Sequence, residues 1–111
     1  AVICEPRIPE LTTLFAIPNG GARHPAVAAR LMAEGVKAGV WDTFLATPRG
    51  GFHGLWLEMK AGRNGLTTDQ KVWGHLMRAA GYRCESVCYS WCEAARAVCA
   101  YLGYAPEEYG V

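Results

Sequence analysis

The chain of 111 residues predicts one α/β domain over residues 1–111, with a mixed central sheet of about four strands flanked by helices. Short apolar segments alternate with segments of helical periodicity, and turns rich in glycine and proline separate them. The composition is 51% hydrophobic and 19% charged, which excludes a disordered chain. No apolar run reaches the length of a membrane-spanning helix, so we expect a soluble globular domain.

The first half of the chain is expected to contain a strand and a helix. A strand is predicted over residues 14–17, because an apolar run is stopped there by the turn signal of residues 18–21. A helix is predicted from Pro25, with Val27 and Leu31 at helical spacing. Glycines that follow should end this helix.

The middle of the chain predicts a β-hairpin, with strands over residues 41–46 and 52–60 joined by a turn over 47–51. Side chains of a strand alternate between two faces. One face of the second strand is therefore apolar and expected to be core, whereas the other carries two charges. The apolar face contains Leu55, Leu57 and Met59, and the other face includes Glu58 and Lys60.

The last part of the chain predicts helix, strand and helix. Thr67 and Gln70 have the spacing of a capping box, which starts a helix over residues 67–80, and Ser90 and Glu93 repeat that spacing before the last helix. The expected buried stripes are Val72, Leu76 and Ala79 or Ala80 in the first helix, and Ala94, Ala95, Val98, Cys99 and Leu102 in the second. The strand over 82–89 should run parallel to the strand over 52–60, because a helix connects them.

Five cysteines occur in the chain, at positions 4, 84, 88, 92 and 99. Their spacing does not match the paired motifs of zinc sites, and no histidine lies close to the last four. Core filling is the favoured interpretation, and a zinc-stabilised structural domain is the alternative.

Asp42 and Glu58 form the candidate catalytic pair. Simple antiparallel pairing of the hairpin places residues whose numbers sum to about 100 opposite each other, so Asp42 should face Glu58. Two facing carboxylates repel each other unless a divalent cation such as Mg²⁺ binds between them. Lys60 lies on the same face and could serve a water or a phosphate there. The alternatives are a turn cap for Asp42 and a solvated ion pair between Glu58 and Lys60.

Four linked motifs carry a family resemblance. They are FAIPNGG (15–21), EGVKAGVWD (34–42), HGLWLEMK (53–60) and LTTDQ (66–70). Together they resemble the VRR-NUC domain, the virus-type replication and repair nuclease of the PD-(D/E)xK nuclease superfamily. The resemblance extends from about Leu14 to Leu102 and implies a restriction-endonuclease-like core.

The resemblance also implies a metal-dependent phosphodiesterase that uses Mg²⁺ or Mn²⁺. Asp42, Glu58 and the main-chain carbonyl of Met59 correspond to the metal ligands. Lys60 would serve the attacking water. Gln70, in the first turn of its helix, would orient Lys60 or a phosphate, and a helix N-terminus itself attracts phosphate.

The sequence departs from the family pattern at two places. Trp41 stands where a proline usually precedes the aspartate. The family's first helix, which carries a glutamate of the metal site, is expected to be absent or truncated, and Glu5 and Glu10 are poor substitutes because prolines flank them.

Basic residues are concentrated in the middle of the chain. Residues 20–63 contain six basic and three acidic side chains, a net charge of +3, whereas the whole chain has +1. We expect this region to contact the phosphate backbone, so that DNA is recognised by shape. The predicted nucleic-acid contacts are Asn19, Gly20, Gly21, Arg23, Lys37 and Arg63, with Arg30 as a further basic residue of the region.

The expected function is an endonuclease acting on structured DNA, similar to a Holliday-junction resolvase, in the cytoplasm of a bacterial or phage-infected cell. The resemblance to stand-alone VRR-NUC domains implies a homodimer. Aromatic residues that could contribute to self-association are Trp73, Trp91, Tyr101 and Tyr104, although each could equally be a core residue. The alternative function is a catalytically weak or inactive DNA-binding module with the same fold.

Overall fold

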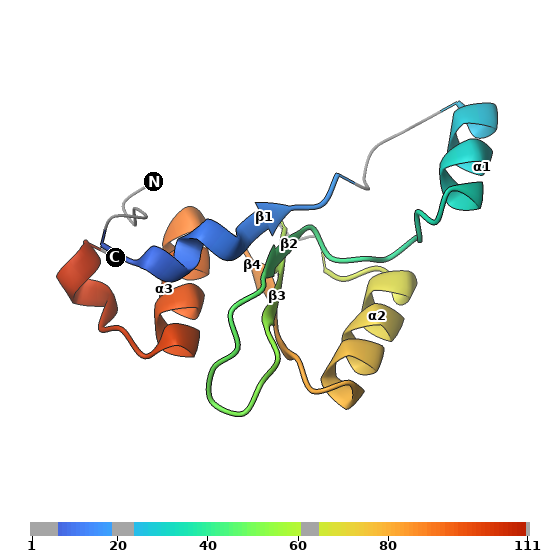
Figure 1. Cartoon of the computed structure of the whole chain (residues 1–111). Helices are drawn as coiled ribbons and strands as arrows, with labels where there is room; N and C mark the ends of the chain where they lie inside the picture. Colours follow the sequence, from blue (N-terminus) through green and yellow to red (C-terminus); the bar gives the residue numbers. More distant parts are fainter. Residues whose placement is uncertain (1–6, 19–23, 61–64, 111) are drawn as a thin grey trace.

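The chain forms a three-layer arrangement in which a sheet lies between two helices (Figure 1). A computed structural model describes residues 7–18, 24–60 and 65–110. Within these ranges, no helix is both long and apolar enough to cross a membrane.

The central sheet is mixed and has the strand order β1-β2-β3-β4. Its strands are β1 (Leu14–Ala16), β2 (Thr43–Leu45), β3 (Leu55–Met59) and β4 (Arg83–Cys88). The β1–β2 and β2–β3 pairs are antiparallel, and the β3–β4 pair is parallel. The predicted mixed sheet and its parallel crossover are therefore confirmed.

The regular pairing of the β2–β3 hairpin is shorter than the sequence predicts, and the connection between the two strands is longer. Regular pairing stops at Leu45 and Leu55, and only an isolated bridge between Arg49 and Phe52 lies beyond it. The predicted strands 41–46 and 52–60 are thus too long. The amide of Ala46, the next residue after β2, donates to the carbonyl of Thr13 at 3.2 Å and not to β3.

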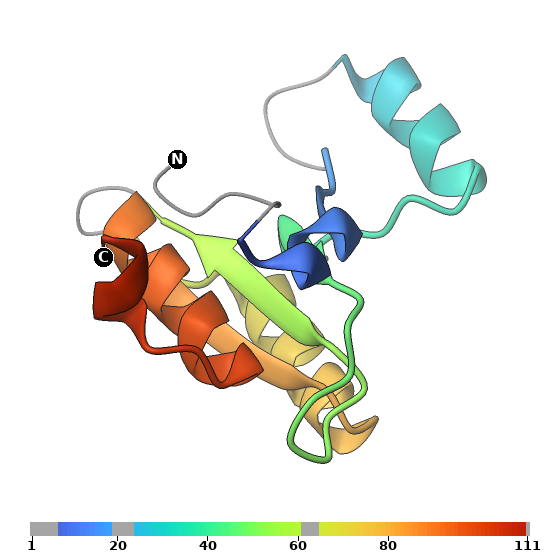
Figure 2. The same cartoon turned by 60° about the vertical axis from the view of Figure 1, so that its left-hand side comes forward.

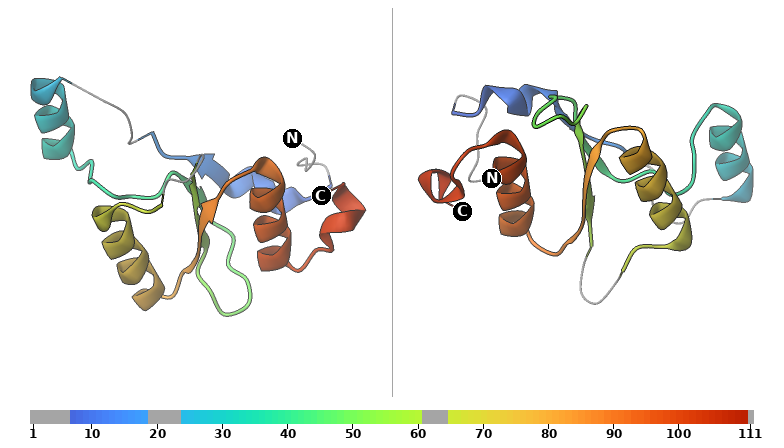
Figure 3. Two further views of the ribbon diagram at one scale, coloured as in Figure 1. Left: turned by 180° about the vertical axis from the view of Figure 1, so that it is seen from behind. Right: turned by 90° about the horizontal axis from the view of Figure 1, so that it is seen from below.

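Helices cover both faces of the sheet, as the two views of Figure 3 show. Helix α2 (Thr68–Ala79) lies on one face and α3 (Trp91–Leu102) on the other. Helix α1 (Pro25–Ala33) extends away from the sheet and from both of these helices (Figures 1 and 2). The 3₁₀ helices η1 (Pro9–Thr13) and η2 (Pro106–Tyr109) were not expected from the sequence.

The larger core lies between the sheet and α3, and we call it the α3-side core. Its buried members are Ile8, Leu45, Leu55, Leu57, Ala94, Val98, Cys99 and Leu102. Four of the five residues predicted for the apolar side of α3 are among them, and Ala95 is only partly buried. Ile8, which precedes η1, is fully buried, so the N-terminal segment closes this core.

A second core lies between the sheet and α2, and we call it the α2-side core. Its buried members are Trp41, Trp56 and Cys84, with Phe44, Trp73, Met77 and Tyr82 packed against them. The charged face of β3 is therefore buried as well, contrary to the expectation that only the face of Leu55 and Leu57 is core. Both faces of β3 are covered, as is common for a strand paired in parallel.

The predicted buried stripe of α2 is wrong. Val72 and Leu76 are 52% and 56% exposed, and Gly74 is the buried residue of the helix. A Cβ on Gly74 would lie 2.9 Å from Cζ2 of Trp41. Because the large Trp41 ring needs the space beside this glycine, α2 presents Gly74, Trp73 and Met77 to the sheet and turns Val72 and Leu76 outward.

The caps of the two long helices follow the predicted signals in part. The reciprocal capping box of Thr67 and Gln70 is present at α2. At α3, the Ser90 hydroxyl accepts from the amide of Glu93, but the Glu93 carboxylate accepts from the amide of Tyr89. The predicted second capping box is therefore only half formed.

Two features of β4 and α3 bear on the cysteines. The β3–β4 register shifts after Glu58, so that Met59 pairs with Cys88, and the strict alternation predicted for residues 82–89 is broken. Cys84 and Cys99 are buried in different cores on opposite faces of the sheet, and Cys92 is exposed. The predicted role of the cysteines as core residues is confirmed for Cys84 and Cys99 and is wrong for Cys92.

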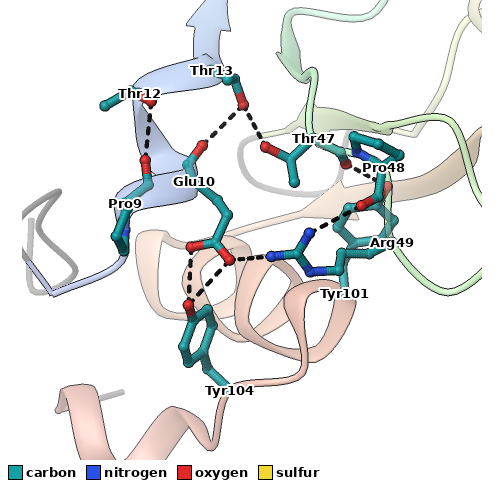
Figure 4. Close-up of polar contacts among 9 residues, drawn as sticks. All are labelled: Pro9, Glu10, Thr12, Thr13, Thr47, Pro48, Arg49, Tyr101 and Tyr104. Carbon is teal, nitrogen blue, oxygen red and sulfur yellow. Dashed lines mark hydrogen bonds and ion pairs between the residues drawn. The ribbon is translucent and has the colours of Figure 1, made fainter.

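A polar cluster ties η1 to the tip of the β2–β3 hairpin and to the chain after α3 (Figure 4). The Glu10 carboxylate accepts from the Tyr104 hydroxyl at 2.9 Å and pairs with Arg49. The Tyr101 hydroxyl donates to the carbonyl of Thr47 at 2.7 Å. These contacts close the hairpin over the α3-side core, and they occupy Glu10 at the hairpin tip.

The segment that leads into β2 runs against the first turn of α2. Gly39 has φ +87°, and a Cβ built there would lie 2.5 Å from the backbone of Asp69. Residues other than glycine rarely adopt this φ, and a Cβ does not fit between Gly39 and the backbone of Asp69. Gly39 is thus required both for conformation and for close approach.

We expect Gly39→Ala to lower the free energy of unfolding more than Gly35→Ala. Gly35 also has a positive φ, +103°, but no atom lies within 4 Å of the position that a Cβ would take there. Both variants should lose about 1–3 kcal/mol for backbone strain, and only Gly39→Ala adds the clash with α2. Urea denaturation measures both, and equal losses would contradict the close approach.

Candidate active site

The β2–β3 hairpin brings two carboxylates together at one edge of the sheet. Thr43 pairs with Leu57 in the register that the sequence predicts, and Asp42 and Glu58 are the next residues of the hairpin beyond this pair. The main-chain amide of Asp42 donates to Oε1 of Glu58 at 3.1 Å. The side chain of Glu58 therefore holds the backbone that carries Asp42.

The Asp42 carboxylate is oriented by contacts across the hairpin. The amide of Met59 lies 3.4 Å from Oδ1 and 3.3 Å from Oδ2. The hydroxyl of Thr43 donates to Oδ1 at 3.1 Å. This carboxylate thus contacts β3 and does not act as a simple cap of its own turn.

Glu58 is buried, with 4% of the residue exposed. Its Oε2 accepts from Nε2 of Gln70 at 3.1 Å and lies 3.3 Å from Nζ of Lys60. The Lys60 side chain is itself only 14% exposed. The alternative of a solvated ion pair between Glu58 and Lys60 is therefore wrong, because both groups are largely shielded from water.

Burial raises the pKa of the Glu58 carboxyl above its ordinary value, and the negative charge of Asp42 raises it further. Lys60 and the amide of Asp42 oppose this shift. Because burial and the Asp42 charge outweigh the favourable contacts, an additional positive charge at the pair would stabilise the ionised form.

Gln70 reaches Glu58 because its helix start is fixed. Its amide N–H donates to Oγ1 of Thr67 at 3.2 Å, and its side-chain Oε1 accepts from the amide of Thr67 at 2.9 Å. With Oε1 engaged, Nε2 is the atom directed at Glu58. Four of the residues singled out from the sequence, Asp42, Glu58, Lys60 and Gln70, therefore meet in one place.

The carboxylates of Asp42 and Glu58 could hold a divalent cation. Among the residues that the structure describes, no group of three or more His, Cys, Asp or Glu side chains suits a metal ion. Two carboxylates are nevertheless a usual protein contribution to Mg²⁺, which keeps several waters. The donor set and the raised pKa of Glu58 fit such an ion.

Other predicted site residues have separate positions. The amide of Met59 contacts Asp42, while its side chain packs against the α3-side core. Lys37 is exposed beside α2, and Arg30 is exposed on α1. Predicted nucleic-acid contacts that lie outside the described residues are Asn19, Gly20, Gly21, Arg23 and Arg63.

Thr43 is a site residue that the sequence analysis missed. Its hydroxyl contacts the Asp42 carboxylate, although its strand position pairs it with the core residue Leu57. A hydroxyl directly after the candidate metal-binding aspartate is the signal that could have identified it. Glu10, in contrast, is engaged by Arg49 and Tyr104 at the hairpin tip (Figure 4).

Comparison with known proteins supports a nuclease-type fold. A solved structure described as a VRR_NUC domain protein superposes with a TM-score of 0.71 and 25% sequence identity, over 85% of this chain and 70% of the other. No protein-family model matches the chain, and no curated protein matches its sequence. The restriction-endonuclease-like core and the resemblance to the VRR-NUC domain are thereby supported by structure as well as by motifs.

We expect Asp42→Asn to lower the pKa of the Glu58 carboxyl, because it removes the neighbouring negative charge. A raised pKa in the folded state means that this carboxyl stabilises the fold most below its ordinary pKa and loses that contribution as pH rises through the raised value. Asp42→Asn should reduce this loss. Carboxyl ¹³C NMR titration of Glu58 measures the shift.

The matched control is Asp69→Asn, which removes a carboxylate from the exposed first turn of α2. It should leave the Glu58 titration unchanged. An equal shift in both variants would mean that general charge, and not the Asp42 contact, sets the pKa of Glu58.

Proposed function

We propose that the chain is a Mg²⁺- or Mn²⁺-dependent endonuclease that hydrolyses phosphodiester bonds in structured DNA. The observation that supports this proposal most is the meeting of Asp42, Glu58, Lys60 and Gln70 at one sheet edge within a nuclease-type fold. A structural role alone would not favour a second carboxylate, Asp42, facing the buried carboxylate of Glu58.

In this proposal, Asp42, Glu58 and the main-chain carbonyl of Met59 hold the cation. When bound, the ion would polarise a phosphate oxygen and lower the pKa of a bound water. The ion would also offset the repulsion between the two carboxylates.

Lys60 acts on the water and the phosphate, and the helix turn that carries Gln70 attracts the phosphate. Nζ of Lys60 lies beside Glu58. In this position, the Lys60 ammonium can donate a hydrogen bond to the attacking water or to a phosphate oxygen that gains negative charge. The oxygen of the water would bond to phosphorus as the bond from phosphorus to the leaving oxygen breaks, with the attacking water losing a proton to solvent and the leaving oxygen taking one up from solvent. The N-terminal turn of α2, which carries Gln70, favours the negative phosphate.

The basic middle of the chain is proposed to follow the DNA backbone. Lys37 and Arg30 are exposed and available for phosphate contacts. Such contacts do not read the base sequence, so the substrate is selected by its shape. Four-way junctions are the proposed substrate, and the proposed activity is similar to that of a Holliday-junction resolvase.

A homodimer is the proposed assembly, and α1 supports it. This helix of nine residues contains one charged side chain, Arg30, and stands apart from the sheet (Figure 1). Helices this short are marginal in water without packing. Val72 and Leu76, both more than half exposed, line a hollow of about 420 Å³ along α2, and we propose that α1 of a second copy packs there.

A cleavage assay tests the nuclease proposal. The protein is incubated with four-way junctions, flaps and plain duplex in Mg²⁺ or Mn²⁺, and cleavage of the junction is expected to be fastest. Lys60→Ala should reduce cleavage by about a hundredfold or more. Lys71→Ala, which removes an exposed lysine from α2, is the control and should retain activity.

Inertness of the folded protein toward all three substrates would contradict the nuclease. Calorimetry with Mn²⁺ then separates the alternative: junction binding that weakens with salt, without metal binding, would favour a DNA-binding module of the same fold.

Sedimentation tests the dimer. Leu76→Glu and Val27→Glu should each weaken self-association by about tenfold or more, because they place a charge in an apolar contact. His75→Glu, an adjacent exposed position of α2 outside the hollow, is the control. A monomeric wild-type protein would contradict the homodimer, and a dimer insensitive to both substitutions would contradict this interface.

A further inference from the structure

Trp41 connects the candidate catalytic hairpin to α2. The residue immediately precedes Asp42 and is fully buried. Its indole Nε1 donates to the main-chain carbonyl of Gln70 at 2.8 Å. A carbonyl oxygen has two lone pairs, so it can accept the indole N–H in addition to a helical N–H.

The side chain of Trp41 lies close to residues from three successive turns of α2, Gln70, Gly74 and Arg78. Beyond the contact with Gln70, the ring lies against Gly74, where no Cβ would fit without displacement. The guanidinium of Arg78 lies 5.9 Å from the ring centroid. The hydrogen bond sets the position of the helix along its axis, and the packing at Gly74 sets its distance from the hairpin.

These contacts link Trp41, Gln70, Glu58 and Asp42 in a closed ring of hydrogen bonds and covalent bonds. Trp41 holds the main chain of Gln70, and the side chain of Gln70 donates to Glu58. Glu58 in turn accepts from the amide of Asp42, which is covalently joined to Trp41. A displacement of the Trp41 indole would therefore move Gln70, and with it the side-chain amide that donates to Glu58.

The indole N–H distinguishes this role from ordinary core packing. Two other tryptophans of the α2-side core, Trp56 and Trp73, have buried indole nitrogens without a hydrogen-bond partner. Packing of a tryptophan in this core thus does not require a partner for the nitrogen. The partner of Trp41 is specifically the residue whose side chain reaches the carboxylate pair.

We propose that Trp41 is a positioning residue, which through its indole N–H holds Gln70 so that the Gln70 amide orients Glu58 for cation binding. The inference rests on the proposed function, because it assigns Trp41 to the same site. Groups that orient metal ligands commonly change metal affinity by about 10–100-fold when removed.

The test replaces Trp41 by benzothienylalanine, which keeps the shape of the ring and lacks the N–H. The first readout is the side-chain amide NMR signal of Gln70 in metal-free protein, which should move toward that of a free glutamine. The second is Mn²⁺ affinity by calorimetry, which should fall about tenfold. Where cleavage is measured, kcat should fall while KM stays unchanged.

The same replacement at Trp56 is the matched control, since its nitrogen has no partner to lose. It should leave the Gln70 signal and the Mn²⁺ affinity unchanged. Trp41→Phe, which removes the N–H by a different route, should reproduce the Gln70 shift. An unchanged Gln70 signal in both Trp41 variants, or an equal change in the Trp56 control, would overturn the proposal.

Failure of the nuclease proposal is distinguishable from failure of this one. Absence of cleavage by the wild-type protein would count against the enzyme alone. The Gln70 signal in metal-free protein needs no activity, so it tests the role of Trp41 independently.

Discussion

The contact between the Asp42 amide and the buried Glu58 carboxylate is the interaction on which the candidate site depends. It places the partly exposed Asp42 next to the buried Glu58, an arrangement that is unfavourable unless other groups compensate. Lys60 and Gln70 supply part of that compensation. The raised pKa of Glu58 indicates that it is incomplete, which leaves the pair suited to a cation.

The two cores hold this pair from opposite sides. The α3-side core fixes the hairpin through Leu45, Leu55 and Leu57, and the polar cluster around Glu10 secures its tip (Figure 4). The α2-side core brings the first turn of α2 against the same hairpin, where Gly39 and Gly74 allow the backbones to approach closely. Stability and the geometry of the site thus arise from the same contacts.

Much of the site was predictable because it depends on local patterns. The register that pairs Thr43 with Leu57 follows from the hairpin, and the capping box that positions Gln70 follows from Thr67 three residues earlier. The outward rotation of α2 was not predictable from the periodicity of Val72 and Leu76. That periodicity records which residues share a face, but the bulk of Trp41 opposite Gly74 decides which face is buried.

By itself, the sequence determined the order of the elements, the mixed sheet, the hairpin register and the placement of Asp42, Glu58 and Lys60 near one another, since each follows from alternation or turn chemistry over a few residues. Gln70 was assigned to the same site only by the resemblance to the VRR-NUC domain. Only the tertiary structure decided that Glu58 and Lys60 are shielded from water, that Thr43 supports Asp42, and that Trp41 reaches the carbonyl of Gln70. These contacts join residues brought together by packing, and packing depends on the volumes of side chains distant in the chain.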